Sequence, residues 1–176
     1  MSRLYLKFPG IEDKENVLDY KQEFLDIDGT IAGSGGLDRF DNYEDWLTKI
    51  NNDISEKTCG EGRVPSTLYL VYRKTDDKLV GLLQIRHKLN DFLLKKGGHI
   101  GDSVRPSERG KGYATEQISL ALVKCKELGL KRVLMTCNKN NIASAKTIQK
   151  NNGVLENEIE LEDGITQRYW IDLTTK

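Results

Sequence analysis

Cysteine, proline and histidine are scarce in this chain of 176 residues, and neither sign of charge is in excess. The cysteines, Cys59, Cys125 and Cys137, lie far apart, so they offer no metal-ligand spacing and suit a reducing compartment. Lysine and arginine total 27, as do aspartate and glutamate, and this balance argues against a basic surface for nucleic acid. No apolar run reaches the roughly 18 residues that span a membrane.

The N-terminus also lacks the pattern of a signal peptide, because Lys7 and Pro9 interrupt its first apolar residues. We therefore expect a cytoplasmic protein with no membrane partner, no nucleic-acid partner and no metal site.

The length suits a single domain spanning residues 1–176, since no linker or repeat divides the chain. The apolar periodicity predicts an α/β fold with a mixed central β-sheet flanked by about four helices. We expect a flexible glycine-rich loop at 26–42. The predicted helices are 11–25, 43–54, 112–128 and 141–150, and the predicted strands are 3–8, 66–73, 78–89, 99–104, 132–137, 154–161 and 165–173.

The densest chemical signal is the segment from Val104 to Thr115. A predicted strand ends at Val104, and two glycines then bracket Lys111 at the start of a predicted helix. Glycines let the backbone approach an anion closely, and the free N–H groups and dipole of a helix N-terminus favour phosphate. This pattern predicts a pyrophosphate site.

Two better-known phosphate motifs do not fit this segment. The dinucleotide fingerprint needs a third glycine where Thr115 stands, and a P-loop needs lysine after its second glycine, whereas Lys111 precedes Gly112.

Here the sequence resembles the GNAT superfamily of N-acetyltransferases. The family's acetyl-CoA motif, Gln/Arg-x-x-Gly-x-Gly/Ala, is matched by Arg109, Gly112 and Ala114. Asn141 to Ala145 is similar to the family's second cofactor segment, and the likeness covers residues 66–155 well. The resemblance implies a GNAT acyl-CoA N-acyltransferase fold, acetyl-CoA as co-substrate, and direct attack by a primary amine in a ternary complex.

The resemblance also implies which residues contact the cofactor and what the partners are. The acceptor would be a small-molecule or protein amine, and many relatives form homodimers. The implied cofactor contacts are the backbone of Val104 for pantetheine, Arg109, Gly110, Lys111, Gly112, Tyr113 and Ala114 for the pyrophosphate, and Asn141 with Ser144 for the cofactor arm.

The general acid is not inherited from the family pattern. Many relatives carry a tyrosine for this role where Gln149 stands here, and glutamine has no proton to donate by titration. Tyr113 and Tyr169 are the nearest candidates.

The general base is equally unassigned, because the family glutamate aligns near Gly98. The candidates are His87, His99 and Asp102, or a chain of water molecules. Alternation along the strand places His99 and Asp102 on opposite faces, so at most one of them can reach a shared site.

Two alternative functions remain open. The missing tyrosine allows a non-catalytic module that binds or senses acyl-CoA. Asp26-x-Asp28-Gly29-Thr30 matches the nucleophile signature of haloacid dehalogenase-like phosphatases, but this signature must end an apolar strand, and Asp19–Glu23 is polar and helical in period.

The glycine-rich loop carries Asp26, Asp28, Asp38 and Asp41. If the loop lies over the acceptor side, these carboxylates could attract a cationic amine.

Overall fold

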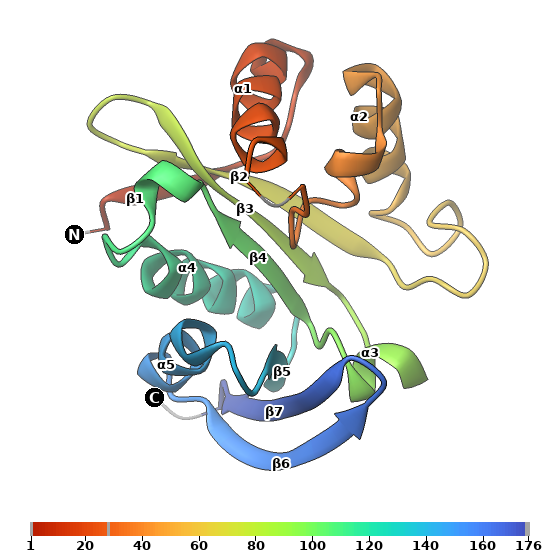
Figure 1. Ribbon diagram of the computed structural model, residues 1–176. Helices are drawn as coiled ribbons and strands as arrows, with labels where there is room; N and C mark the ends of the chain where they lie inside the picture. Colours follow the sequence, from red (N-terminus) through yellow and green to blue (C-terminus); the bar gives the residue numbers. More distant parts are fainter. Residues whose placement is uncertain (1, 28, 175–176) are drawn as a thin grey trace.

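Two antiparallel sheets form the frame of the molecule (Figure 1), and the computed structural model describes residues 2–27 and 29–174. The larger sheet has the order β1 (Leu4–Lys7), β2 (Ser66–Arg73), β3 (Lys78–Arg86) and β4 (Ile100–Val104). The smaller sheet has the order β5 (Arg132–Asn138), β7 (Gly164–Asp172) and β6 (Val154–Leu161).

The sheets meet at the start of β4. The N–H of His99 donates to the carbonyl of Leu134 over 2.8 Å, and the N–H of Leu134 donates to Nδ1 of His99 over 2.9 Å. No other backbone hydrogen bond joins β4 to β5 within the described ranges. The α/β class is confirmed, but in place of one mixed sheet the chain forms two sheets whose ladders are antiparallel, with an unpaired edge of β4 facing β5.

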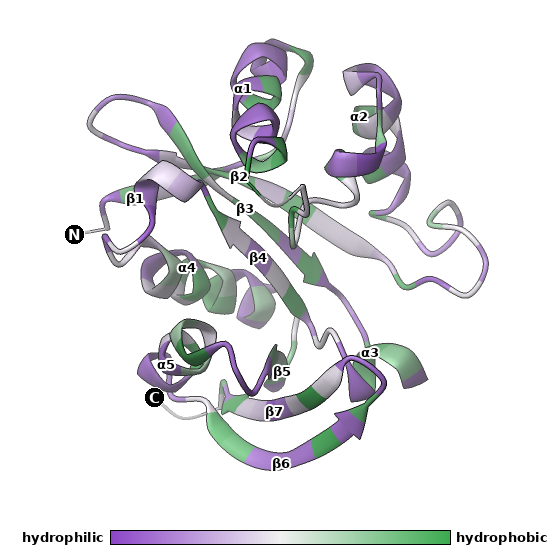
Figure 2. Ribbon diagram, in the orientation of Figure 1, coloured by the Kyte–Doolittle hydropathy of each residue, from purple (hydrophilic) through white to green (hydrophobic). Residues whose placement is uncertain are grey.

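Helices cover both faces of the larger sheet. α1 (Lys14–Leu25) and α2 (Tyr43–Asn52) lie on one face, where Tyr20 and Trp46 pack with Leu70 and Leu82. Hydrophobic and hydrophilic residues alternate along these two helices, as they do along β6 (Figure 2).

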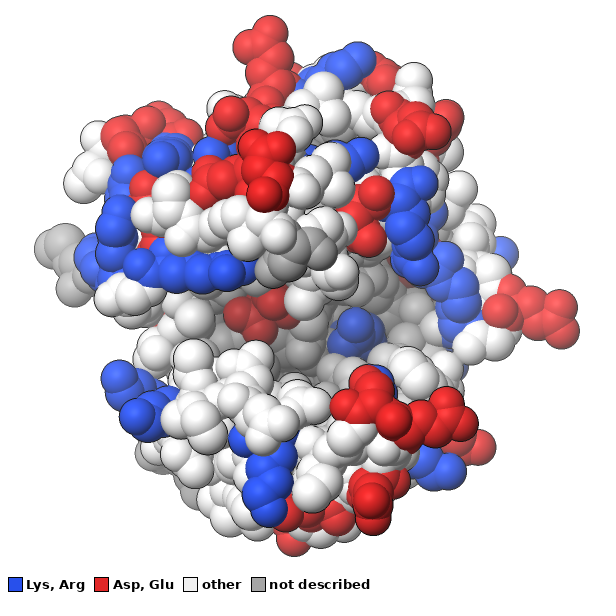
Figure 3. Space-filling view, in the orientation of Figure 1, with Lys and Arg blue, Asp and Glu red and all other residues white. Residues whose placement is uncertain are grey.

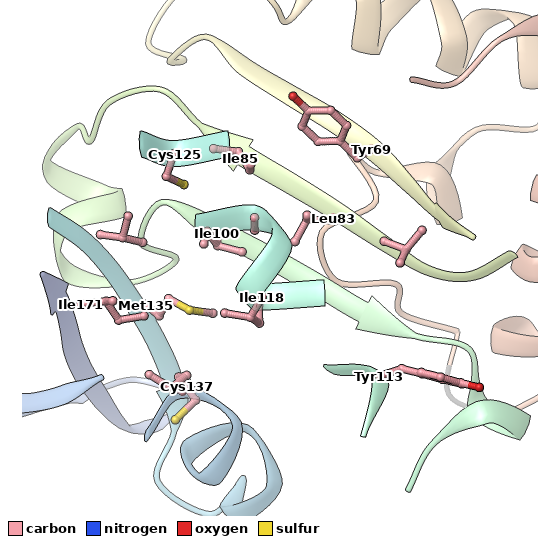
Figure 4. Close-up of a cluster of buried hydrophobic side chains, with 14 of the residues drawn as sticks. Tyr69, Leu83, Ile85, Ile100, Tyr113, Ile118, Cys125, Met135, Cys137 and Ile171 are labelled. Carbon is pink, nitrogen blue, oxygen red and sulfur yellow. The ribbon is translucent and has the colours of Figure 1, made fainter. Parts of the chain in front are cut away.

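On the other face, α4 (Tyr113–Glu127) and α5 (Ile142–Lys150) fill the space between the two sheets. Ile118 of α4 packs with Leu83 and Ile100 of the larger sheet and with Met135 of the smaller one (Figure 4). This shared core holds the two sheets together although few hydrogen bonds connect them.

Shorter elements complete the chain. They are α3 (Asp91–Lys95), in a segment expected to be a loop, and 3-10 turns at Ile11–Asp13, Leu37–Arg39 and Pro106–Glu108. The glycine-rich segment is irregular, as expected, but it is packed: Ile31 and Leu37 are buried, and the indole N–H of Trp46 donates to the carbonyl of Ser34 over 2.8 Å. No helix in the described ranges is long and apolar enough to cross a membrane.

Candidate active site

A tight turn brings the end of β4 into α4. The 3-10 turn Pro106–Glu108 is followed by Gly110 and Gly112, whose φ angles of +78° and +82° lie in the left-handed region. Residues with a Cβ adopt this region at a cost, so the two glycines allow the chain to reverse here. Gly112 is also the N-cap of α4, and it has no side chain with which to cap the helix.

The turn therefore presents a row of backbone N–H groups that are available as hydrogen-bond donors. The backbone N–H groups of residues 110–115 donate no hydrogen bond to any other described residue. They surround the N-terminus of a 15-residue helix, where the helix dipole adds partial positive charge. Such a turn can bind the oxygens of a pyrophosphate through backbone groups alone.

Glu108 anchors this turn to the larger sheet through ion pairs. It is buried and forms ion pairs with Arg73 (2.8 Å), Lys78 (2.9 Å) and Lys111 (2.7 Å). Burial by itself would raise the pKa of Glu108, but the hydrogen bonds from Lys111, Lys78 and Arg73 lower it to about 2. Lys111 therefore holds the turn together, and part of its charge is already neutralised.

Tyr113 and Arg109 take different positions at the turn. The ring of Tyr113 is buried, with the guanidinium of Arg3 4.7 Å from its centroid, and its hydroxyl accepts a hydrogen bond from Arg73 over 3.1 Å. Figure 4 shows Tyr113 at the edge of the core, so its hydroxyl serves to anchor α4. Arg109 is exposed, and its guanidinium lies 5.5 Å from the ring of Phe24.

The second predicted cofactor segment lies at the N-terminus of α5. Asn141 is the N-cap, and its Oδ1 accepts from the N–H of Ser144 over 3.0 Å. The side chain of Asn151 donates to the carbonyl of Thr115, which ties the end of α5 to the first turn of α4. The structure thus brings the two predicted cofactor segments onto two helices in direct contact.

A hollow crosses the face of the molecule between the half that carries α1 and α2 and the half that carries α5 and β6 (Figure 3). Part of it is a cavity of about 570 Å³ on the α1/α2 face of the sheet. The glycine-rich segment closes this cavity against β4, because a Cβ on Gly33 would lie 2.2 Å from the carbonyl oxygen of Gly101.

A family model described as an acetyltransferase (GNAT) domain matches residues 3–154, which is most of the chain. The chain belongs to the GNAT family of acetyltransferases. Its activity is accordingly the transfer of an acetyl group from acetyl-CoA to an amine.

Solved structures share the fold over nearly their whole length. A Salmonella typhimurium acetyltransferase that modifies the N-terminal serine of a 50S ribosomal protein is 15% identical, with a TM-score of 0.66 over 98% of this chain and 96% of that one. The spermidine/spermine N-acetyltransferase of Vibrio cholerae is also 15% identical, with a TM-score of 0.68 over 97% and 94%.

A microcin C7 self-immunity acetyltransferase, solved with acetyl-CoA and AMP, is 17% identical, with a TM-score of 0.68 over 97% of this chain and 93% of that one. At these identities the likeness concerns the fold. No curated protein matches the sequence.

Among the candidate bases of this GNAT chain, His99 is occupied in joining the sheets. Its Nδ1 already accepts the N–H of Leu134, so the neutral ring carries its proton on Nε2. Burial, together with the nearby charge of Arg86, lowers the pKa of His99 to about 4. The nitrogen that could accept a proton is thus already occupied and the pKa is low, so we do not retain His99 as the base.

Asp102 is better suited to that role. Burial raises the pKa of its carboxyl group, and a 2.8 Å hydrogen bond from Nε2 of Gln117 acts in the opposite direction. The residue is nevertheless partly exposed, so a proton can reach it. As expected, it does not meet His99: Asp102 contacts α4, whereas His99 contacts β5.

The remaining candidates have other surroundings. His87 lies beside Thr67, whose hydroxyl is 2.8 Å from its Nε2. The hydroxyl of the buried Tyr169 donates to Gln167 over 2.8 Å, and burial raises the pKa of Tyr169. Gln149 is exposed on α5.

The phosphatase hypothesis is wrong on structural grounds. Asp26 follows helix α1 rather than a strand, it is exposed, and it accepts a hydrogen bond from Gln22. Asp28 lies outside the described residues. No group of three or more His, Cys, Asp or Glu side chains could hold a metal ion in the part of the chain that the structure describes.

Sequence reasoning missed the charge of the cavity. Of the three expected acidic residues that the structure describes, Asp38 lines the cavity and Asp26 and Asp41 do not. Four basic residues line it: Arg39, Lys49, Arg63 and Arg86. They come from four separate segments, and no local motif could have identified them.

Proposed function

We propose that this chain catalyses direct transfer of the acetyl group from acetyl-CoA to a primary amine in a ternary complex. The observation that carries the proposal is the row of backbone N–H groups at residues 110–115, which have no acceptor among the described residues and can donate to the pyrophosphate of the co-substrate. Asn141 and Ser144 lie on the neighbouring helix, where they would face the pantetheine arm.

Starting from the protonated amine, the acceptor nitrogen must lose two protons, one before it attacks and one as the amide forms. A primary amine with a pKa of about 10.4 is almost fully protonated at neutral pH and must lose a proton before it can attack. Asp102 takes this proton in our proposal, because its raised pKa makes it a stronger base than an ordinary aspartate. The amine nitrogen then bonds to the thioester carbonyl carbon and gives up its second proton to water. The carbon–sulfur bond breaks, and the thiolate of coenzyme A leaves and is protonated from solvent.

A dedicated acid is less important in this scheme. A thiol has a pKa of about 8.5, so its thiolate leaves without prior protonation far more readily than an alkoxide. The glutamine at position 149 is therefore compatible with transfer.

The sequence alone also allowed a module that binds acyl-CoA without reaction. Mass spectrometry of a panel of amines incubated with acetyl-CoA and the protein separates the two. N-acetylated product together with free thiol supports transfer, whereas saturable acetyl-CoA binding with neither product supports the binding module.

The cellular compartment and the oligomeric state of the protein are proposals as well. Three buried, unpaired cysteines suit a reducing compartment such as the cytoplasm. The homodimer remains a prediction, and light scattering would test it.

A further inference from the structure

The cavity beside β4 has the dimensions of a small-molecule site. Its volume of about 570 Å³ falls within the roughly 300–1,000 Å³ typical of ligand pockets. Apolar side chains form part of its wall, among them Ile31, Phe92 and Leu93. It touches β4 through Gly33 and Gly101.

The charge of the cavity is positive after its internal ion pairs are counted. Lys49 and Arg63 both contact the buried carboxylate of Asp53, at 2.6 and 3.1 Å. Arg39 and Arg86 form no ion pair with any carboxylate in the described ranges. In Figure 3, basic side chains follow the right-hand side of the hollow below α2.

Arg86 is the most informative of these residues. Its Nη1 donates to the carbonyls of Gly97 (2.8 Å) and Gly98 (3.1 Å), which fix the guanidinium in place. Its Nη2 lies 3.2 Å from the position of a Cβ on Gly101, so the free end of the fork faces β4. Burial lowers the pKa of Arg86, and a largely desolvated guanidinium without a counterion is costly unless an anion joins it.

We propose that the acetyl acceptor is an amine that also bears an anionic group, a carboxylate or a phosphate, which Arg86 and Arg39 bind in this cavity. Arginine suits this role because its planar fork matches both anions. A polyamine would bring like charge to the same place. The inference rests on the proposed acetyl transfer, since it concerns the acceptor of that reaction.

The test compares matched probes that differ only in charge. N-acetyl amino acids with apolar side chains, and their neutral carboxamides, are titrated by calorimetry into protein with and without coenzyme A. We expect the best carboxylate to bind about tenfold more tightly than its amide, as one charge-assisted contact warrants. Competition by acetate and by inorganic phosphate then identifies which anion the site prefers.

Variants localise the effect. Arg86→Gln and Arg39→Gln should each reduce the preference for the carboxylate. The side chain of Arg39 forms no hydrogen bond or ion pair with residues 2–27 or 29–174, so we expect the second variant to fold normally. Arg132→Gln, at an exposed arginine that stacks on Trp170 outside the cavity, is the matched control and should keep the preference.

Equal affinity for carboxylates and amides, a preference for spermidine, or a preference that survives both cavity variants overturns the inference. Each outcome is measured by binding, so it stands apart from the proposed transfer, which fails only if acetyl-CoA is not bound or not turned over.

Discussion

Replacing Gly112 by valine should separate cofactor binding from folding. Gly112 has a φ of +82°, and a Cβ there would have only Nη2 of Arg3 nearby, at 3.5 Å, so the fold has room for a side chain. The cost is mainly backbone strain of about 1–2 kcal/mol, with more for a β-branched residue. At ~2–4 °C per kcal/mol for a domain of this size, the melting temperature should fall by roughly 2–8 °C.

The effect on acetyl-CoA should be larger. Relief of the strain turns the N–H groups of residues 112 and 113 away from the pyrophosphate, and each hydrogen bond to a charged group contributes about 1.5–3 kcal/mol. Two lost bonds weaken binding by about 100-fold or more. Acetyl-CoA at ~100 times its Kd adds ~2.7 kcal/mol to the free energy of unfolding of the unsubstituted protein, which raises its melting temperature by roughly 5–11 °C. The same concentration should raise the melting temperature of the variant by roughly 1–2 °C.

Gly129 is the matched control. It follows the other end of α4 with a φ of +83°, and a Cβ there would meet nothing within 4 Å. Gly129→Val should therefore lose similar stability and keep the full response to acetyl-CoA. The reasoning is refuted if the Gly112 variant responds like the unsubstituted protein, or if both variants lose the response equally.

Two further predictions concern the titrating groups. Asp102→Asn should lower kcat/KM by about 10²–10⁴ and leave the rise in melting temperature with acetyl-CoA unchanged. Gln117→Met removes the hydrogen bond that lowers the pKa of Asp102, so it should move the acidic limb of the pH–rate profile to higher pH. A rate within a few-fold of normal in the first variant, or an unmoved limb in the second, would argue against Asp102 as the base. The folded-state pKa of His99 is about 4, below the ~6.5 of an unfolded histidine, so the unfolded chain binds its proton first and stability should fall by about 3 kcal/mol as the pH drops from 6.5 towards 4. Melting curves across this range should be flatter for His99→Gln, and parallel curves would contradict the assignment.

Local patterns predicted most of the elements and the glycine-rich turn before α4. The helix expected at 112–128 spans Tyr113–Glu127, because its apolar spacing and the flanking Gly112 and Gly129 act within one short segment. A short motif can also mislead: the phosphatase-like motif that begins at Asp26 follows a helix and not a strand.

Long-range pairing could not be predicted in this way. The bridge between His99 and Leu134 joins residues 35 positions apart, and it uses an imidazole nitrogen where a strand would use a carbonyl. The cationic cavity depends on packing too, since Arg39 and Arg86 come together only when the glycine-rich segment folds over β4.

The central claim is that the backbone of residues 110–115 binds the pyrophosphate of acetyl-CoA, and amide NMR tests it most directly. We would record ¹H–¹⁵N spectra during a titration with coenzyme A. The account predicts that the amide signals of Gly110 to Thr115 shift together and become protected from hydrogen exchange. Saturable binding that moves other amides and leaves these signals in place would contradict it.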